Sequence, residues 1–238
     1  SDRRFFSGMA IAMAAVTFAG FAPTYYLVGL SDRVTPVLTP NVQIHGLLCT
    51  AWILLLIVQT RLVAAGRRDI HKRLGIAGVL VAAAILITGI MLAVNSQRRV
   101  HTAATADTLA DPYVFLIFPF FAVGLFAAFA TLGVLHRHRP DVHKRLMLLA
   151  AANLTIPALA RIVNQLSSLD MVVVPGVIGA AVLVNLYLIP MIVHDYTSRG
   201  RLHSVTLYGG ACMLISEPLR FAIGFSAPWQ VFARAVMG

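Results

Sequence analysis

The stretch that decides the fold is Asp69-Ile70-His71-Lys72-Arg73-Leu74, because the chain repeats it almost letter for letter at residues 141–146 as DVHKRL. A fainter third copy at residues 201–204 keeps only the aliphatic residue and the histidine. Each copy lies where a polar turn gives way to a long apolar run, so each is predicted to open a helix. We therefore expect three repeated helical hairpins joined by basic turns.

The composition is that of a membrane protein. The 238 residues are 59% hydrophobic and 12% charged, with a mean hydropathy of +0.83, which leaves too little polar surface for a soluble globule of this size. The net charge of +10 comes from residues that punctuate apolar runs, so we interpret it as facing anionic lipid headgroups and not nucleic acid. Cys49 and Cys212 lie inside predicted spans at different depths and indicate neither a disulfide nor a metal site.

Seven apolar runs are each long enough to cross about 30 Å of hydrocarbon. They predict an all-α, polytopic transmembrane bundle of seven helices that forms a single domain over residues 1–238. The first run is interpreted as a retained span and not as a cleaved leader. The expected spans are Phe5–Val28, Val42–Val63, Leu74–Val94, Pro112–Leu135, Leu146–Val163, Val172–Val193 and Val205–Ile223.

The basic residues also predict the orientation of the bundle. Thirteen of the nineteen Lys and Arg residues fall at the N-terminus or at the ends and turns that share its side of the membrane. By the positive-inside rule this side is cytoplasmic, which places the N-terminus inside and the C-terminus outside.

Polar residues inside spans are costly, so each is a candidate for function. Five of them are predicted to lie in the outer third of the membrane and to converge: His45, Arg161, Asn164, Glu217 and Arg220. One interpretation is an ion-pair cluster that fastens the fifth span to the seventh. The other is an outward-facing pocket that holds the head of a lipid, a quinone or a tetrapyrrole while apolar walls hold its tail.

A second candidate site lies at the inner ends of the helices. It comprises His71, His143, His194 and His203 together with Lys72 and Lys144. The simpler interpretation is that the lysines and neighbouring arginines anchor the hairpins to headgroups, with Asp69 and Asp141 as N-cap residues. The sharper ones are an anion site for a phosphate or propionate at three helix N-termini, or a b-type haem held by two of these histidines at similar depth.

Several classes are excluded or disfavoured by the same residues. Both lysines, Lys72 and Lys144, lie at helix ends, so no buried lysine is available for a retinal Schiff base. The nucleotide-binding, zinc-protease and serine-hydrolase signatures GxxxxGK[ST], HExxH and GxSxG are absent from the sequence. No catalytic or metal-ligating set is predicted.

A set of motifs carries a resemblance. His45-Gly46 followed by Trp52 and Gln59, the two DxHKRL copies, and the run Glu217-Pro218-Leu219-Arg220 resemble a group of bacterial predicted membrane proteins. The similarity covers the second to the seventh span and implies a fold and a place in the bacterial inner (cytoplasmic) membrane, but no activity. A looser similarity to cytochrome b561-like bundles rests on histidines near helix ends.

Three functions remain open. The first is a non-catalytic membrane subunit or binding module, accessory to a larger membrane complex and in contact with lipid or another amphipathic ligand. The second is a membrane redox protein that binds b-type haem or quinone. The third is a small transporter, disfavoured because the repeats are parallel and show no inverted pair of interrupted helices.

Overall fold

The computed structural model describes residues 2–30, 38–103, 111–167 and 176–238, and within these ranges the chain is helical without a strand. The first helix, α1, continues into a π-helical turn, η1, and a short 3₁₀ turn, η2. The elements are α1 (Asp2–Phe21), η1 (Ala22–Tyr26), η2 (Val28–Leu30), α2 (Pro40–Ala64), α3 (Arg68–Ala103), α4 (Pro112–Phe115), α5 (Ile117–Leu135), α6 (Pro140–Ser167), α7 (Gly176–Asn185), α8 (Leu188–Arg199), α9 (Ser204–Gly224) and α10 (Ala227–Met237).

Six helical segments of the described chain are long and apolar enough to cross a membrane, so by length and composition this is a multi-pass membrane protein. They are Asp2–Tyr26, Pro40–Ala64, Arg68–Arg99, Pro112–Leu135, Pro140–Leu166 and Gly179–Arg199. The seventh predicted span corresponds to α9. That helix is 21 residues long, but Glu217, Pro218 and Arg220 lower its hydropathy, and it is not among the six.

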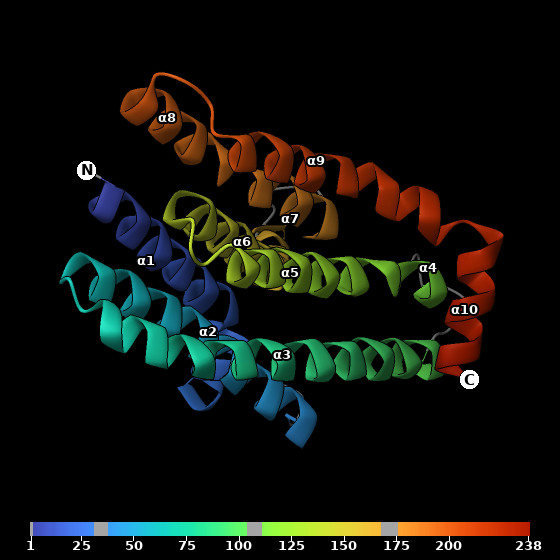
Figure 1. Cartoon of the computed structure of the whole chain (residues 1–238). Helices are drawn as coiled ribbons and strands as arrows, with labels where there is room; N and C mark the ends of the chain where they lie inside the picture. The colour runs from blue at the N-terminus through green and yellow to red at the C-terminus, as the bar shows by residue number, and fades with distance from the viewer. Residues whose placement is uncertain (1, 31–37, 104–110, 168–175) are drawn as a thin grey trace.

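Helix α6 forms the centre of the bundle. It packs against α1, α5, α7 and α9, and Figure 1 shows it among these helices. Most of the residues that it buries are small or apolar, including Ala150, Ala151, Ala152 and Ala158. Small side chains let neighbouring helices approach closely, which is how helices associate in lipid, where apolar burial alone gives no advantage.

The first contact of this kind is between α1 and α6. A Cβ atom added to Gly20 would lie 2.4 Å from the carbonyl oxygen of Ala158. The backbones therefore meet directly at this point. The same helix face of α1 buries Met13 and Thr17.

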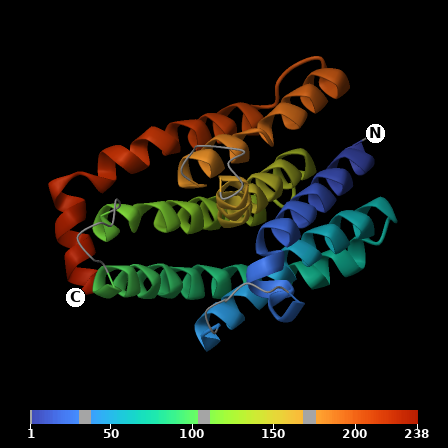
Figure 2. The ribbon, with the colours of Figure 1, turned by 180° about the vertical axis from the view of Figure 1, so that it is seen from behind.

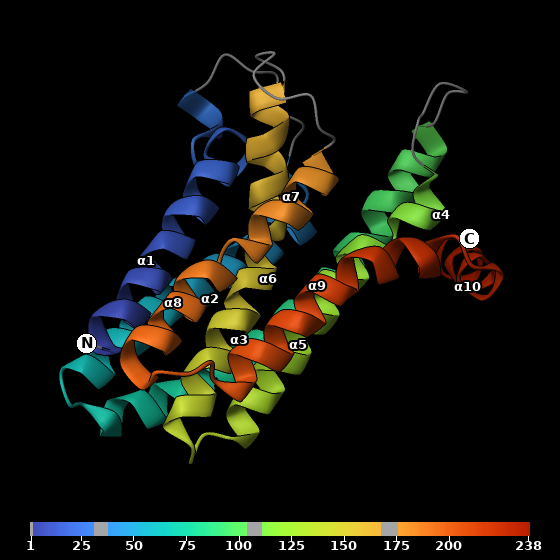
Figure 3. The ribbon, with the colours of Figure 1, turned by 90° about the horizontal axis from the view of Figure 1, so that it is seen from above.

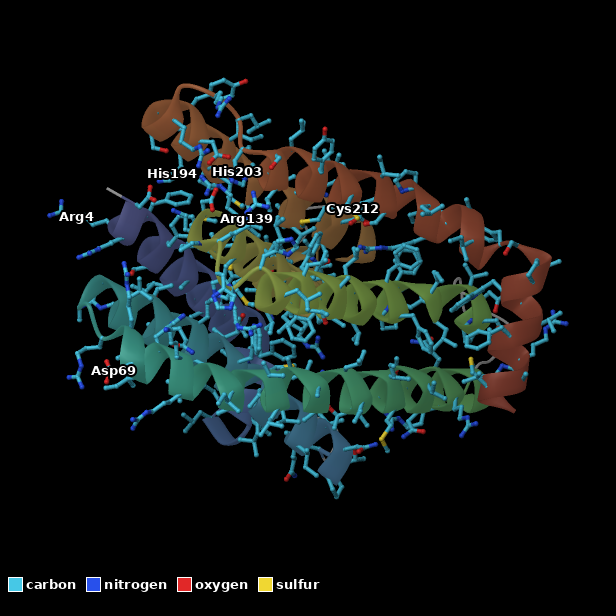
Figure 4. All side chains as sticks on the ribbon, in the orientation of Figure 1. Arg4, Asp69, Arg139, His194, His203 and Cys212 are labelled. Atoms are coloured by element: carbon cyan, nitrogen blue, oxygen red, sulfur yellow. The ribbon has the colours of Figure 1, made fainter. Side chains whose placement is uncertain are left out.

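The two ends of the bundle differ. The N-terminal end of α1 lies at the same end as the turns that join α2 to α3, α5 to α6 and α8 to α9, whereas α10 and the C-terminal residue lie at the other end (Figures 1 and 3). Seen from behind, α10 again crosses the ends of the long helices and does not run along them (Figure 2). Side chains labelled in Figure 4 show Arg4, Asp69, Arg139, His194 and His203 toward the turn end.

The expected N-caps are displaced in the structure. Helix α3 begins at Arg68 and α6 at Pro140, so Asp69 and Asp141 lie inside the first turn and not before it. A carboxylate there still interacts favourably with the positive end of the helix dipole. A side-chain cap is found instead on α9, where His203 Nδ1 accepts a hydrogen bond from the Val205 N–H at 3.1 Å.

Candidate functional site

The second copy of the repeated motif lies within a network of ion pairs at the turn end of the bundle. Arg145 and Asp195 form an ion pair whose side chains are only 2% and 1% exposed. Arg145 Nε donates to Asp195 Oδ1 at 3.0 Å, and one terminal nitrogen donates to the Asp141 carbonyl oxygen at 2.8 Å. We expected the basic residues of the motif to reach lipid headgroups. For Arg145 this is wrong, because its charge is buried and paired.

The same pair extends to α9. Asp195 Oδ2 accepts a hydrogen bond from the His203 backbone N–H at 3.1 Å. The imidazole of His203 faces Asp141, with Nε2 3.1 Å from Asp141 Oδ2. Because His203 Nδ1 accepts from Val205, the ring carries its proton on Nε2 and donates it to the carboxylate, so His203 is neutral here. The network therefore joins α6, α8 and α9.

The protonation of His203 follows from its surroundings. Burial lowers the pKa of His203, because desolvation disfavours the imidazolium, and the nearby Arg145 and Arg199 act in the same direction. The hydrogen bond to Asp141 opposes this effect only in part. The lowered pKa agrees with a ring that uses one nitrogen as the N-cap acceptor.

A third carboxylate, Asp2, joins the beginning of α1 to the network. Asp2 pairs with Lys144 and lies 3.0 Å from His194 Nε2. The ring of Phe5 stacks on His194 with centroids 4.0 Å apart. We predicted that an external anion binds beside Lys144, His194 and His203. In the structure the carboxylates of Asp2 and Asp141 lie next to these side chains.

The histidines of the two motif copies meet. His71 on α3 and His143 on α6 have ring centroids 6.1 Å apart and nearly perpendicular planes. His143 Nδ1 donates to the Gly133 carbonyl oxygen at 2.7 Å. The His71 Nδ1 atom is buried without a hydrogen-bond partner among the described residues. Lys72 beside it is exposed, as the headgroup-anchor interpretation expects.

The outer candidates have separate partners. His45 Nδ1 lies 2.9 Å from Thr88 Oγ1, and that hydroxyl donates to the Ala84 carbonyl oxygen at 2.7 Å. His45 therefore donates to Thr88, and its Nε2 lies 3.4 Å from the Cys49 sulfur. All of its ring nitrogens are satisfied, and it links α2 to α3.

Arg161 and Asn164 lie on α6. The Arg161 guanidinium lies 4.3 Å from the ring centroid of Phe21 and donates to the Pro157 carbonyl oxygen at 3.1 Å. Asn164 faces the beginning of α7, where its Oδ1 would be 2.1 Å from a Cβ atom on Gly176. Neither makes a hydrogen bond or ion pair with Glu217 or Arg220 in the part of the chain that the structure describes.

Glu217 and Arg220 form an ion pair within α9, with 3.3 Å between Oε2 and one terminal nitrogen. Arg220 also donates to Ser216 Oγ at 3.2 Å and lies 5.7 Å from the ring centroid of Phe121 on α5. We expected an ion-pair cluster that joins the fifth span to the seventh. This pair lies within α9 and does not join α9 to α6. The five outer residues make contacts at four different helix interfaces.

A groove lies beside Glu217, between the end of α7 and the middle of α9. Its volume is about 640 Å³. The lining residues are Ala181, Val182, Asn185, Leu186, Leu214, Glu217, Pro218 and Phe221. Asn185 and Glu217 are its polar members, and each has one buried side-chain oxygen without a hydrogen-bond donor among the described residues.

No group of three or more potential metal ligands among His, Cys, Asp and Glu occurs in the described ranges. Comparison with protein-family models, curated proteins and solved structures finds no match to this chain. The resemblance to bacterial membrane proteins therefore stays a prediction.

Sequence reasoning missed three members of these sites. Asp195 lies in the polar segment just after the sixth predicted span, and its partner Arg145 is 50 residues away in the sequence, so no local pattern singled it out. Asp2 gave no signal, because its partners Lys144 and His194 are far away in sequence. Asn185 was hidden in an apolar run.

Proposed function

We propose that the protein is a non-catalytic membrane binding module that holds an amphipathic ligand in the groove between α7 and α9. The observation that carries this proposal is a groove of about 640 Å³ with apolar walls and two polar residues, Asn185 and Glu217. Ligand sites of about 300–1,000 Å³ with few, well-placed polar groups are typical of small-molecule binding.

The chemistry of the two polar residues defines the head of the ligand. Asn185 Nδ2 donates to the Ala181 carbonyl oxygen at 2.6 Å. Its side-chain oxygen has no donor among the described residues and can accept a hydrogen bond from a ligand. Glu217 Oε2 is paired with Arg220 at 3.3 Å, but this contact lacks hydrogen-bond geometry, so the oxygen can still accept a hydrogen bond. Buried acceptors without a donor are costly, and a ligand head with hydroxyl or amino groups supplies donors. The apolar tail then lies along Val182, Leu186 and Leu214.

We further propose the topology that accompanies this function. The turn end of the bundle, with Arg67, Arg68, Arg137 and Arg139, faces the cytoplasm of a bacterial cell, and α9 is a seventh crossing. The positive-inside rule supports this orientation. We also propose that the protein is an accessory subunit, because a protein that binds a ligand without catalysing a reaction needs a partner protein that acts on this ligand.

The experiment is to purify the protein in mild detergent and to identify every bound small molecule and co-purifying chain by mass spectrometry. We expect a lipid-like molecule with a hydroxyl or amino head at near-stoichiometric amounts. Val182→Trp fills the groove and is expected to lose it. Leu80→Trp is the control, because Leu80 is an exposed aliphatic residue on α3 away from the groove.

The variant Glu217→Gln tests separately whether Glu217 binds the polar head of the ligand. The carboxamide keeps the size of the side chain but removes its charge, so the ligand is expected to be retained less well than in the Leu80→Trp control. Equal ligand content in all four proteins, or no ligand in any of them, contradicts the proposal. Stoichiometric partner chains would support the accessory role, and their absence would speak against it.

One observation favours a second candidate, a redox protein with b-type haem. A b-type haem in a helix bundle needs two imidazoles at similar depth on facing helices, and the rings of His71 on α3 and His143 on α6 lie next to each other, with centroids 6.1 Å apart. The bond from His143 Nδ1 to a backbone carbonyl is the kind of support that ligating histidines have. A Soret band that shifts on dithionite reduction and is lost in His143→Ala would support this candidate, and a featureless spectrum would exclude it.

A further inference from the structure

Helix α10 is an amphipathic helix held at the end of the bundle. It runs across the long helices near their ends in Figure 1, is seen nearly end-on beside α4 in Figure 3, and packs against α3, α4 and α9. The Trp229 indole N–H donates to the Tyr113 carbonyl oxygen at 2.8 Å, and Arg98 donates to the Val236 carbonyl oxygen at 2.5 Å. Ala233 and Met237 are buried. The position of α10 is therefore fixed by contacts with the bundle.

The sequence of α10 divides its circumference into three arcs at 100° per residue. The first arc, Trp229, Ala233 and Met237, faces the bundle. The second arc is polar and contains Gln230 and Arg234. The third arc is apolar and exposed, and it contains Pro228, Val231, Phe232 and Ala235. The exposed apolar arc and the polar arc lie on opposite sides of the buried arc.

The apolar arc has no cover among the residues that the structure describes. Val231 is 70% exposed, and Phe232 and the preceding Phe225 are exposed as well. Such residues grouped on one side of a short helix indicate a contact surface. Exposed apolar residues also occur in the last turns of α9, among them Phe221 and Leu219.

The aromatic residues around α10 identify what covers this surface. Trp229 packs against Phe120 and Phe232, with ring centroids 5.8 Å and 5.2 Å apart. The guanidinium of Arg234 lies 5.6 Å from the ring centroid of Tyr113. Trp, Tyr and basic residues gather at the boundary between hydrocarbon and headgroups. Amphipathic helices that lie in this plane have an apolar face toward the acyl chains and a basic face toward water.

We infer that α10 is an interfacial helix that lies in the membrane–water boundary at the end of the bundle opposite the basic turns. Val231 and Phe232 are immersed in the acyl chains of the bilayer. Arg234, which is exposed beside the Tyr113 ring, lies among the headgroups, whereas Gln230 is half-buried and donates to the Gly224 carbonyl oxygen at 2.8 Å. The helix thereby sets the depth at which this end of the bundle sits in the membrane.

The test places one spin label at a time on α10 of the full chain in lipid vesicles. Cys49 and Cys212 are first replaced by alanine, and cysteine is then introduced as Val231→Cys or Arg234→Cys. Collisions with oxygen, which concentrates in the acyl region, and with a water-soluble nickel chelate are measured for each label. Leu80→Cys on the apolar exterior of α3 and Arg67→Cys in a basic turn supply the lipid and water references.

We expect the label at position 231 to behave like the one at position 80, and the label at position 234 to collide with the chelate like the one at position 67. Two labels that are both open to the chelate would place α10 in water and overturn the inference. Two labels shielded from both agents would mean that another protein covers α10, which also overturns it. A labelled variant that melts at a lower temperature than its cysteine-free parent is replaced by a second measurement. This is the quenching of Trp229 fluorescence by brominated lipids in the Trp52→Phe variant, and an absence of quenching overturns the inference.

Discussion

At the scale of the residue, the buried pair of Arg145 and Asp195 is the most demanding feature of the molecule. Taking charges out of water is costly, and a buried ion left without its partner costs about 3–5 kcal/mol. We predict that Asp195→Asn lowers the free energy of unfolding by about this amount, because Arg145 then stays buried with no carboxylate. Chemical or thermal unfolding in mild detergent measures the effect.

The first motif copy supplies the matched control. Asp69 pairs with Arg67 at 3.6 Å, and their side chains are 63% and 59% exposed. Exposed pairs contribute about 0–1 kcal/mol, so Asp69→Asn is expected to change stability by no more than that. Similar losses in Asp69→Asn and Asp195→Asn would show that burial of the pair is not what matters.

His203 predicts how stability depends on pH. Burial lowers the pKa of His203 in the folded protein, whereas an unfolded histidine titrates near about 6.5. The neutral ring therefore contributes stability that is complete above about pH 6.5 and is lost as the pH falls through the lower, folded pKa. Protonation also removes the N-cap acceptor for Val205.

The variant that isolates this effect is His203→Asn, because asparagine is a good N-cap residue and does not titrate in this range. Melting temperatures of both proteins between pH 5 and 8 give the comparison. The wild type is expected to lose more stability on acidification than the variant, because the two proteins differ only at position 203. Parallel curves would mean that His203 is not responsible.

At the scale of the element, the contact between α1 and α6 depends on the absence of a side chain at Gly20. A Cβ there meets the carbonyl oxygen of Ala158 at 2.4 Å, and backbone atoms cannot move aside cheaply. We predict that Gly20→Ala destabilises the protein by about 1–3 kcal/mol, the usual cost of overpacking. Gly8→Ala in the same helix has open space around its Cβ and is expected to stabilise by about 0.5–1 kcal/mol. Equal melting temperatures for the two variants would contradict a close approach at Gly20.

The helices were the most predictable part of the chain. Long apolar runs and basic turns predicted seven spans, and six candidate spans are found among the described helices, because length and hydropathy are properties of the sequence alone. The partners of the polar residues were not predictable in this way. Helical spacing correctly places Glu217 and Arg220 on neighbouring turns, but it does not say whether Arg161 turns toward them or toward Phe21 on α1. That choice depends on how the helices pack.

At the scale of the whole molecule, the two nearly identical motif copies have different surroundings. Arg73 is exposed in the first copy, whereas the equivalent Arg145 is buried in the second. The difference lies in the neighbours, because α8 and α9 bring Asp195 and His203 to the second copy. The repeat therefore predicts where helices begin, while the position of each copy in the bundle decides whether its charges are at the surface or inside.

The topology of the whole molecule depends on whether α9 crosses the membrane. Helix α9 begins beside the Arg145 network at the turn end and ends where α10 begins (Figure 1). Its Glu217 and Arg220 neutralise each other through their ion pair, which lowers the cost of placing both in the membrane. We predict that α9 crosses, so that Ser198→Cys and Gly238→Cys, in a cysteine-free background, react with an impermeant thiol reagent from opposite sides of oriented vesicles. Position 198 is expected to react only from the cytoplasmic side, together with Arg67→Cys. Reaction of positions 198 and 238 from one side would mean six crossings, with α9 lying along the membrane surface.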